Sequence, residues 1–267
     1  MCFLPCASRQ GRPFWPPAGD HEGRPYGAFA PIRKDWEARM AYHILLVDDA
    51  PELRRMVGEL LEGAGYACRP AFSGSEAALW AGQYEYDLVL LDLMLPGLTG
   101  EEFIAQMRQK KTMPIIVLSA KAGLEDRVNV LRLGADDFIP KPFDNAEVLA
   151  RVEAQLRRYK QFSGGGGSAV LTHGDLTLDR ESVTVTAAGK PVTVTAREFD
   201  ILTLLMEHPK KVFTREQLYE QVWGGEYMGD DNTVNVHISN LRAKLAKASP
   251  AEYIKTVWGI GFKMSDL

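Results

Sequence analysis

Acidic, hydroxyl and basic side chains follow short apolar runs at four places in the first half of the chain. Asp48 and Asp49 follow one such run, and Asp92 follows another. Ser119 and Lys141 follow two more. Grouped carboxylates repel each other unless a cation lies between them, and hard oxygen ligands suit Mg²⁺. A carboxylate there can accept a phosphoryl group as an acyl phosphate, while a lysine and a serine bind the phosphoryl oxygens. If these places meet, the sequence predicts a magnesium-dependent phosphoryl site with Asp92 as acceptor.

The elements that must bring these residues together are alternating strands and helices. Apolar runs of strand length are separated by segments with helical patterns. This alternation predicts a parallel α/β sheet with helices on both faces, in which the carboxyl ends of the strands share one edge. The expected strands are 43–48, 66–70, 86–91, 114–119 and 136–140, and the expected helices are 51–62, 74–82, 99–109, 124–132 and 144–158.

Each of these residues also has an ordinary structural interpretation. The acidic pair could cap the helix that follows it. Asp92 and Ser119 could begin turns, and Lys141 alone would be a surface charge. Their arrival at successive strand ends is what favours a common site.

Composition limits the class of protein. The 267 residues are 46% apolar and 25% charged, as in a globular protein of one large or two ordinary domains. No apolar run approaches a membrane span, and three cysteines cannot form a disulfide framework, which favours a reduced, cytoplasmic protein. Residues 42–158 hold 18 acids and 13 bases (net −5), and residues 168–267 hold 13 and 11 (net −2). Neither half has the basic excess that would by itself indicate nucleic-acid binding.

The first 39 residues differ in character from the rest. Residues 1–39 hold six of the fifteen prolines and show no sustained periodicity, so we expect a disordered leader. Codons for Trp36, Glu37 and Ala38 can contain GGGAGG shortly before the Met40 codon, which resembles a bacterial ribosome-binding site. Either translation begins at Met40 and the leader is not native, or the leader is a genuine disordered tail.

A glycine-rich linker at 161–169 separates a first domain at 40–160 from a second at 170–267. Four consecutive glycines predict a flexible tether. Beyond it, the patterns predict a winged helix-turn-helix, whose long helix lies in the major groove of DNA and whose hairpin lies against the minor groove. The expected strands are 176–178, 183–186 and 192–195, the helices are 196–207, 215–222 and 232–248, and the hairpin is formed by 253–257 and 262–264.

The first domain resembles a response-regulator receiver domain. The resemblance implies a flavodoxin-like fold with strand order 2-1-3-4-5. It rests on the acidic pair Asp48-Asp49, on Asp92 in Asp-Leu-Met-Leu-Pro-Gly, on Ser119-Ala120, on Gly-Ala-Asp-Asp-Phe at 134–138, and on Lys141-Pro142-Phe143.

The same resemblance implies roles for individual residues. Asp92 would be the phosphoacceptor, and Lys141 would neutralise charge on the phosphoryl group. Asp49, Asp92 and the Met94 carbonyl would bind Mg²⁺ directly, and Asp48 would help to place the ion through water. The bond between Lys141 and Pro142 would be cis.

Ser119 and Phe138 resemble the switch pair of the family. Ser119 would move toward the phosphoryl oxygen and the Phe138 ring would then turn inward, although phenylalanine lacks the hydroxyl of the commoner tyrosine. The face reshaped by this movement would form a homodimer on phosphorylation. The alternative for its charged residues is a solvated surface. The dimer face is expected to contain Arg127, Asp137, Glu147 and Arg151.

Taken across both domains, the chain resembles an OmpR/PhoB-type response regulator. The second domain contributes the stretches 195–199, 214–218, 233–238 and 254–262, and the region from Arg151 to Phe162 with the Val-Trp-Gly wing faintly resembles the vancomycin-resistance regulators. Four of the expected DNA contacts (Asn232, Ser239, Asn240 and Trp258) stand where relatives often carry arginine, which implies a shallower salt dependence of DNA binding. An ordinary surface helix is the alternative. The residues expected to contact DNA are Asn232, Thr233, Asn235, His237, Ser239, Asn240, Arg242, Lys244, Thr256 and Trp258.

The sequence therefore predicts a phosphorylation-dependent transcription factor of a two-component system, and not an enzyme. Its expected partners are a sensor histidine kinase, direct repeats of promoter DNA, RNA polymerase (through residues 223–230) and a second copy of the chain. One alternative is a metal-dependent phosphatase that turns over at Asp92. The other is a signalling adaptor whose second domain does not bind DNA.

Overall fold

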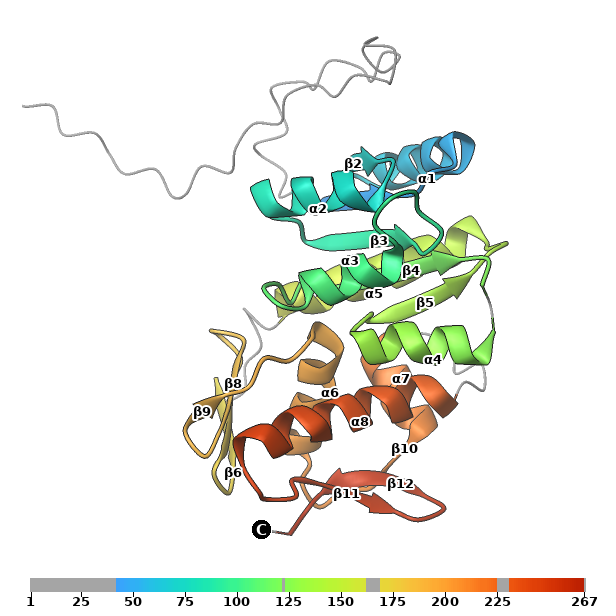
Figure 1. Cartoon of the computed structure of the whole chain (residues 1–267). Coiled ribbons are helices and arrows are strands. Elements are labelled where there is room, and N and C mark those ends of the chain that lie inside the picture. Colours follow the sequence, from blue (N-terminus) through green and yellow to red (C-terminus); the bar gives the residue numbers. More distant parts are fainter. Residues whose placement is uncertain (1–41, 122, 162–168, 225–230, 267) are drawn as a thin grey trace, which may run out of the picture.

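The structure is a computed structural model that describes residues 42–121, 123–161, 169–224 and 231–266. The expectations for the leader 1–39 and for most of the linker 161–169 fall outside these ranges. In the part that is described, none of the helices combines the length and the apolar character needed to cross a membrane. Two layered units are visible in Figure 1, and they lie against each other.

The described residues of the first unit are built around a five-stranded parallel sheet. Its strands pair in the order β2-β1-β3-β4-β5, which confirms the predicted topology. Every residue of β1, β3 and β4 is buried, because helices cover both faces of the sheet. The strands are β1 (His43–Val47), β2 (Ala67–Ala71), β3 (Leu88–Asp92), β4 (Ile115–Ser119) and β5 (Asp137–Pro140).

Helices α1 and α5 cover one face of this sheet, and α2, α3 and α4 cover the other. Alternate strand residues divide between the two faces: Ile44 packs with α1 and α5, whereas Leu45 packs in the cluster on the opposite side. Ser73 caps α2 by accepting a hydrogen bond from the Glu76 amide. The helices are α1 (Pro51–Gly63), α2 (Gly74–Gln83), α3 (Gly100–Met107), α4 (Leu124–Leu133) and α5 (Asn145–Gln161).

The described part of the second unit combines an antiparallel sheet, three helices and a small terminal sheet, which confirms the predicted winged helix-turn-helix. Capping boxes at Thr195 and Thr214 fix the starts of α6 and α7. The first sheet contains β6 (Val170–His173), β7 (Leu176–Asp179), β8 (Thr184–Ala187) and β9 (Lys190–Pro191); the helices are α6 (Ala196–Glu207), α7 (Arg215–Trp223) and α8 (Asp231–Ala248); the terminal sheet contains β10 (Phe213–Thr214), β11 (Ile254–Val257) and β12 (Gly261–Met264).

Short strands are where the structure departs from the sequence analysis. Strands β6 and β10 were not predicted, because two to four residues give little periodicity to recognise. The predicted strand at 192–195 is wrong. Only Lys190–Pro191 forms the short strand β9 beside β8, and the chain then continues to the Thr195 cap of α6.

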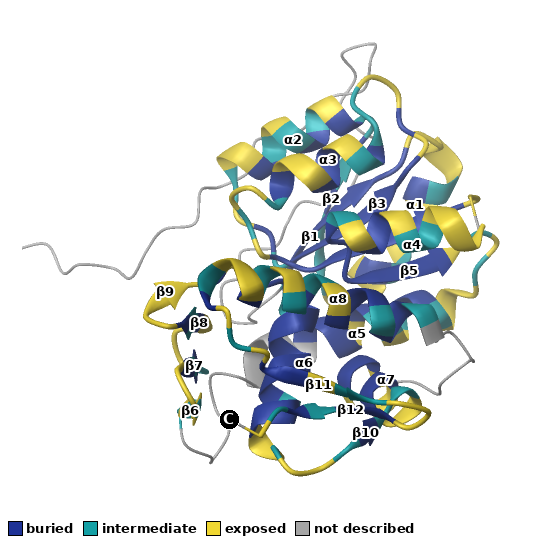
Figure 2. Cartoon of the chain, turned by 60° about the horizontal axis from the view of Figure 1, so that its bottom comes forward, coloured by how far each residue is buried: buried dark blue, intermediate teal, exposed yellow. Residues whose placement is uncertain are grey.

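Helix α8 contacts both units. Its buried stripe of Val234, Ile238, Leu241 and Leu245 packs into the core of the second unit. Another side of α8 lies along α4 of the first unit, and Val236 belongs to the apolar cluster on that face of the sheet (Figures 1 and 2). The two units therefore share a packed interface, which the flexible tether predicted between them did not suggest.

Candidate functional site

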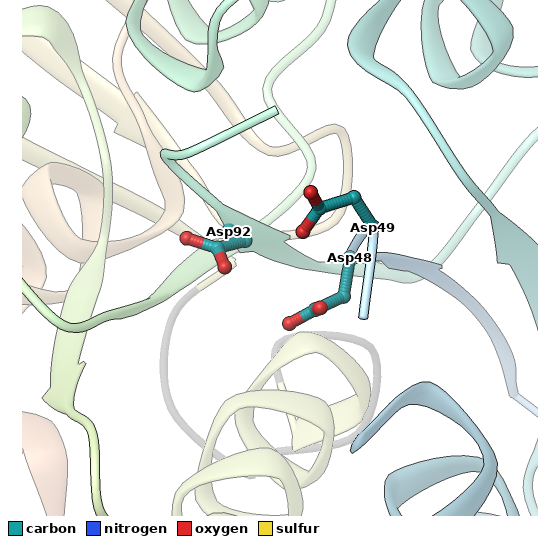
Figure 3. Close-up of side chains that lie close together, drawn as sticks. All are labelled: Asp48, Asp49 and Asp92. Atoms are coloured by element: carbon teal, nitrogen blue, oxygen red, sulfur yellow. The ribbon is translucent and has the colours of Figure 1, made fainter. Parts of the chain in front are cut away.

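Three carboxylates meet at the carboxyl edge of the parallel sheet, as the sequence predicts. Asp92 is the last residue of β3, and Asp48 and Asp49 directly follow the neighbouring strand β1. An oxygen from each carboxylate lies within 4.8 Å of the others. Asp48 is 1% exposed and Asp92 is 6% exposed, whereas Asp49 is open to solvent. Figure 3 shows the three side chains at this edge.

Lys141 supplies a positive charge to this cluster from the end of β5. Its ammonium donates to Asp48 Oδ2 at 2.7 Å and to Asp92 Oδ2 at 2.5 Å. Burial lowers the pKa of Lys141, but its hydrogen bonds to these two carboxylates outweigh that effect and raise the pKa above its ordinary value. Lys141 is therefore a fixed cation in the site. The peptide bond to Pro142 is cis, as expected.

The backbone around Asp92 is tightly packed. The Met94 amide donates to Asp92 Oδ1 at 3.0 Å, which orients the carboxylate. Gly100, which the sequence analysis did not single out, begins α3 against the end of β3. A Cβ atom at Gly100 would lie 2.6 Å from the Asp92 carbonyl oxygen and 2.6 Å from the Leu93 Cα, so only glycine fits.

Ser119 and Phe138, the expected switch pair, lie on the adjacent strands β4 and β5. Ser119 is fully buried, and its hydroxyl oxygen accepts a hydrogen bond from the Lys121 amide at 3.1 Å. Phe138 is 6% exposed and lies in the same apolar cluster as Val236 of α8.

The predicted dimer face makes contacts within the chain. Arg151 on α5 donates to Asp137 at 2.9 and 3.0 Å, to Glu147 at 2.9 and 3.0 Å, and to the Tyr219 hydroxyl of α7 at 3.2 Å. The carboxylate of Asp137, ahead of the opposing effect of burial, raises the pKa of Arg151 well above its ordinary value. Arg127 lies on α4 in the same region.

Asp136 joins the two units, and the sequence analysis did not identify this role. Its Oδ2 accepts from Arg108 at 2.6 Å and from the Ile115 amide at 2.9 Å, both in the first unit. Its Oδ1 accepts from the Arg197 amide at 3.3 Å, and its carbonyl accepts from Trp223 Nε1 at 3.3 Å, both in the second unit.

We call the contact between the two units the closed interface. Asn240 of α8 adds a hydrogen bond from its Nδ2 to the Leu131 carbonyl of α4 at 3.0 Å. The polar residues of the closed interface are Asp136, Asp137 and Arg151 on one side, with the Leu131 carbonyl, and Arg197, Tyr219, Trp223 and Asn240 on the other.

Two of the residues expected to contact DNA, His237 and Thr233, are buried in the structure. His237 is 1% exposed and Thr233 is 5% exposed. The His237 ring lies with its centroid 5.3 Å from that of Trp223. Burial, and next the Arg197 cation, lower the pKa of His237 to about 3, so the ring is neutral near pH 7. In this arrangement His237 cannot reach a DNA base.

Several other expected DNA contacts are engaged inside the protein. Arg215 donates to Asn235 at 2.9 Å, and Arg242 donates to the Ile254 carbonyl at 2.7 Å and to Thr256 Oγ1 at 2.9 Å. Lys244 bonds to the buried Glu198 at 2.5 Å, and Asn240 is held in the closed interface as described above.

The remaining residues of this set are accessible. Ser239 is exposed and Asn232 is partly exposed. Trp258, in the turn of the terminal hairpin, is 90% exposed and stands beside Ile260, which is 53% exposed. The hairpin tip is therefore open, whereas α8 is partly covered by the first unit.

Two family models match the chain. Residues 44–153 match the response regulator receiver domain, and residues 189–264 match the C-terminal domain of transcriptional regulatory proteins.

Relatives match along both units. The transcriptional regulatory protein ResD of Bacillus subtilis is 43% identical over 226 residues, which cover 82% of this chain and 94% of ResD. The uncharacterized transcriptional regulatory protein YcbL of the same organism is 41% identical over 225 residues, covering 83% and 100%. The regulatory protein VanR of Enterococcus faecium is 39% identical over 229 residues, covering 84% and 99%.

Among solved structures, a cysteine-to-serine mutant of RitR superimposes with a TM-score of 0.71 at 32% identity, covering 84% of this chain and 99% of that one. A TM-score of 0.71 requires both units to superimpose together, since neither unit makes up two thirds of the chain. The fold, the acidic edge of the sheet and these relatives agree. The chain belongs to the OmpR/PhoB-type response regulators: it is a DNA-binding transcriptional regulator of a two-component system.

Proposed function

We propose that Asp92 accepts a phosphoryl group from a sensor histidine kinase, and that this modification controls DNA binding by the winged helix. The supporting observation is the convergence of Asp48, Asp92 and Lys141 at one sheet edge, with bonds of 2.5 and 2.7 Å from the lysine. In the reaction, a carboxylate oxygen of Asp92 forms a bond to phosphorus while the phosphorus–nitrogen bond of the kinase phosphohistidine breaks.

The residues around Asp92 fit a divalent cation. Three carboxylates approach within 4.8 Å of one another. Among the described residues only Lys141 forms an ion pair with this cluster, and it does so with Asp48 and Asp92 but not with Asp49. The three negative charges therefore exceed the single positive charge by two, and oxygen donors suit Mg²⁺.

We assign the Mg²⁺ ligands as Asp49, Asp92 and the Met94 carbonyl, with Asp48 placing the ion through water. When bound, the ion would neutralise charge on the transferring phosphoryl group. Lys141 would bind a phosphoryl oxygen with the ammonium that it now directs at the two carboxylates. The Ser119 hydroxyl would donate to another phosphoryl oxygen, for which the Ser119 side chain must leave its present bond with the Lys121 amide.

The closed interface is the element that phosphorylation would control. It holds α8 against α4, and it buries His237 and engages Asn240, so the helix cannot enter a major groove in this arrangement. Phe138 lies in the apolar cluster that contains Val236 of α8, which provides a direct route from the switch pair to the DNA-binding helix. A movement of Ser119 and Phe138 would thus destabilise the interface.

Dimerisation would compete with the closed interface. The α4–β5–α5 face carries the expected dimer residues Arg127, Asp137, Glu147 and Arg151, and it is the face against which α7 and α8 pack. One face cannot hold both partners. We therefore propose that phosphorylation frees this face for a homodimer, whose two winged helices bind direct repeats of promoter DNA in the cytoplasm and contact RNA polymerase through residues 223–230.

The test compares Asp92→Asn with a matched acid-to-amide control, Glu125→Gln, on the exposed start of α4. We expect acetyl phosphate or the purified kinase to label the wild type and Glu125→Gln equally, and Asp92→Asn not at all. Phosphorylation should also tighten binding to promoter DNA in a gel-shift assay. Undiminished labelling of Asp92→Asn would disprove the site assignment. Rapid multiple turnover of the phosphodonor would favour a phosphatase instead.

A further inference from the structure

A cavity of about 510 Å³ lies between the two domains at one end of the closed interface. Its receiver wall comes from the end of α3, the end of α4 and the segments that follow them. Its winged-helix wall comes from the segment 190–195 and the last turns of α8. A volume of this size is sufficient for a small ligand.

The charge of the cavity lining is entirely positive. Among the described residues that line it there are six cations and no carboxylate, and the remainder are apolar or neutral polar residues. This contrasts with the net negative charge of both domains. The cations are Arg108, Lys111 and Arg132 from the receiver, and Lys190, Lys244 and Lys247 from the winged-helix domain.

Half of these cations are already engaged in ion pairs. Arg108 pairs with Asp136, Lys111 pairs with Glu85, and Lys244 pairs with Glu198. The other half form no ion pair among the described residues: Arg132, Lys190 and Lys247. Arg132 comes from the receiver, and both lysines come from the other domain. An ion that binds all three must therefore bridge the domains.

We propose that this cavity binds a small polyphosphate anion, and that the bound anion stabilises the closed arrangement. A chain of phosphoryl groups carries several negative charges along its length, and arginine and lysine are the usual partners of phosphate oxygens. Because a ligand stabilises the state that it binds, an anion held by both domains opposes their separation. This inference rests on the closed interface of the proposed function.

A second, smaller cavity suggests where an organic group could lie. It has a volume of about 250 Å³ and shares the wall 191–195 with the first. Its lining includes Val183, Val185 and Phe199. The anion could thus be inorganic polyphosphate or the phosphate chain of a nucleotide, and the experiment compares both.

The experiment is isothermal titration calorimetry on the unphosphorylated full-length protein at a fixed ionic strength of about 0.1 M, where surface charges are partly screened. The probes are inorganic tripolyphosphate, ATP without Mg²⁺, and orthophosphate. We expect tripolyphosphate to bind in a 1:1 ratio, at least about tenfold more tightly than orthophosphate, since it can reach cations on both walls. Tighter binding of ATP than of tripolyphosphate would support the proposal with a nucleotide as the ligand.

The variants Arg132→Gln and Lys247→Gln remove one cation from each wall. Each should weaken tripolyphosphate binding about five- to tenfold, less than the loss of a buried charge-assisted hydrogen bond, because both side chains are exposed and solvent screens their charge. Lys110→Gln and Lys210→Gln are matched controls, because both lysines are exposed and neither lines the cavity. These controls should bind like the wild type.

Three results would overturn the proposal. The first is an absence of saturable binding. The second is equal weakening in the controls and the cavity variants, which would indicate general attraction to a charged surface. The third is a result in which Lys247→Gln weakens tripolyphosphate binding but Arg132→Gln does not. The anion would then bind to the winged-helix domain alone, in the manner of a DNA phosphate. Asp92→Asn should retain anion binding, so failure here leaves the phosphorylation proposal intact.

Discussion

At the scale of single residues, Lys141 and His237 show how burial and charge fix protonation. The Lys141 ammonium lies between two carboxylates and its pKa is raised, so it remains a cation at every physiological pH. His237 lies beside other cations in a buried position, and its pKa is lowered to about 3. One residue is thus a permanent charge in the proposed phosphorylation site, and the other is neutral only while it stays buried.

Substituting Lys141 tests the role of that permanent charge. In Lys141→Gln, the phosphoryl oxygens lose a charge-assisted hydrogen bond of about 1.5–3 kcal/mol, so the rate of phosphorylation by acetyl phosphate should fall about 10- to 100-fold. Affinity for Mg²⁺ should not fall, because the carboxylates lose a competing cation. Stopped-flow fluorescence and Mg²⁺ titration measure the two quantities. A parallel loss of Mg²⁺ affinity would instead indicate that the site has collapsed.

His237 predicts a pH dependence of the closed state. The groups that face its ring are Arg197 and Lys244, which are cations, Asp136 and Asp137 from the receiver, and the Trp223 ring. An exposed His237 takes up a proton near its ordinary pKa of 6.5, whereas the buried ring does so only near 3. As the pH falls from 6.5 to 3, states that expose the ring therefore gain about tenfold in population for each pH unit. The free energy of unfolding decreases by about 1.4 kcal/mol per unit over the same range.

The corresponding measurement is urea unfolding at pH 7.5 and pH 5.5, with His237→Gln as the comparison. Between pH 7.5 and pH 5.5, the free energy of unfolding of the wild type should fall by about 1.4 kcal/mol more than that of the variant, because pH 5.5 is one unit below the ordinary histidine pKa. Identical losses in the two proteins would show that His237 titrates normally and is therefore not buried.

At the scale of elements, α5 and α7 are joined by Arg151 and Tyr219. Arg151 keeps Asp137 and Glu147 as partners within the receiver, so its bond to the Tyr219 hydroxyl is an additional one. That bond exists only when the domains are closed. Removing the hydroxyl should therefore weaken the closed interface without disturbing the receiver.

The variant Tyr219→Phe should bind promoter DNA about 10- to 100-fold more tightly than wild type when both are unphosphorylated, since a hydrogen bond from a charged group such as the Arg151 guanidinium contributes about 1.5–3 kcal/mol. Tyr253→Phe is the control, because the Tyr253 hydroxyl bonds to Asp175 at 2.6 Å within the winged-helix domain. Gel-shift titrations give both affinities. Unchanged binding by Tyr219→Phe would mean that this contact does not restrain α8.

At the scale of the whole molecule, phosphorylation should change both domains together. If it opens the closed interface, amide hydrogen exchange should increase in residues 124–140 and in 232–248 to a similar extent, because each segment covers the other. Residues 51–63 of α1, on the far face of the sheet, serve as an internal control and should not change. In Asp92→Asn, no segment should respond to acetyl phosphate. Faster exchange in residues 124–140 alone would mean that phosphorylation changes the receiver without opening the closed interface.

The strand order was implied by the resemblance to receiver domains, whereas the sequence by itself determined the parallel sheet and the meeting of Asp48, Asp92 and Lys141. These follow from local rules, since apolar runs form buried strands and the carboxyl ends of parallel strands share an edge. Capping residues such as Thr195 and Thr214 likewise fixed helix starts, because the cap and the helix are adjacent in the chain. Short strands such as β10 were not predicted, since their pairing partners are distant in the sequence and their own residue pattern is too short to recognise.

Only the tertiary structure decided how the two domains lie against each other. The closed interface depends on the fit of surfaces far apart in the sequence, such as Asp136 against Trp223 and Leu131 against Asn240. A glycine-rich linker carries no information about that fit. For the same reason the pattern of α8 identified its buried stripe but not the second face that the receiver covers. The burial of His237 and the cationic cavity both result from that docking.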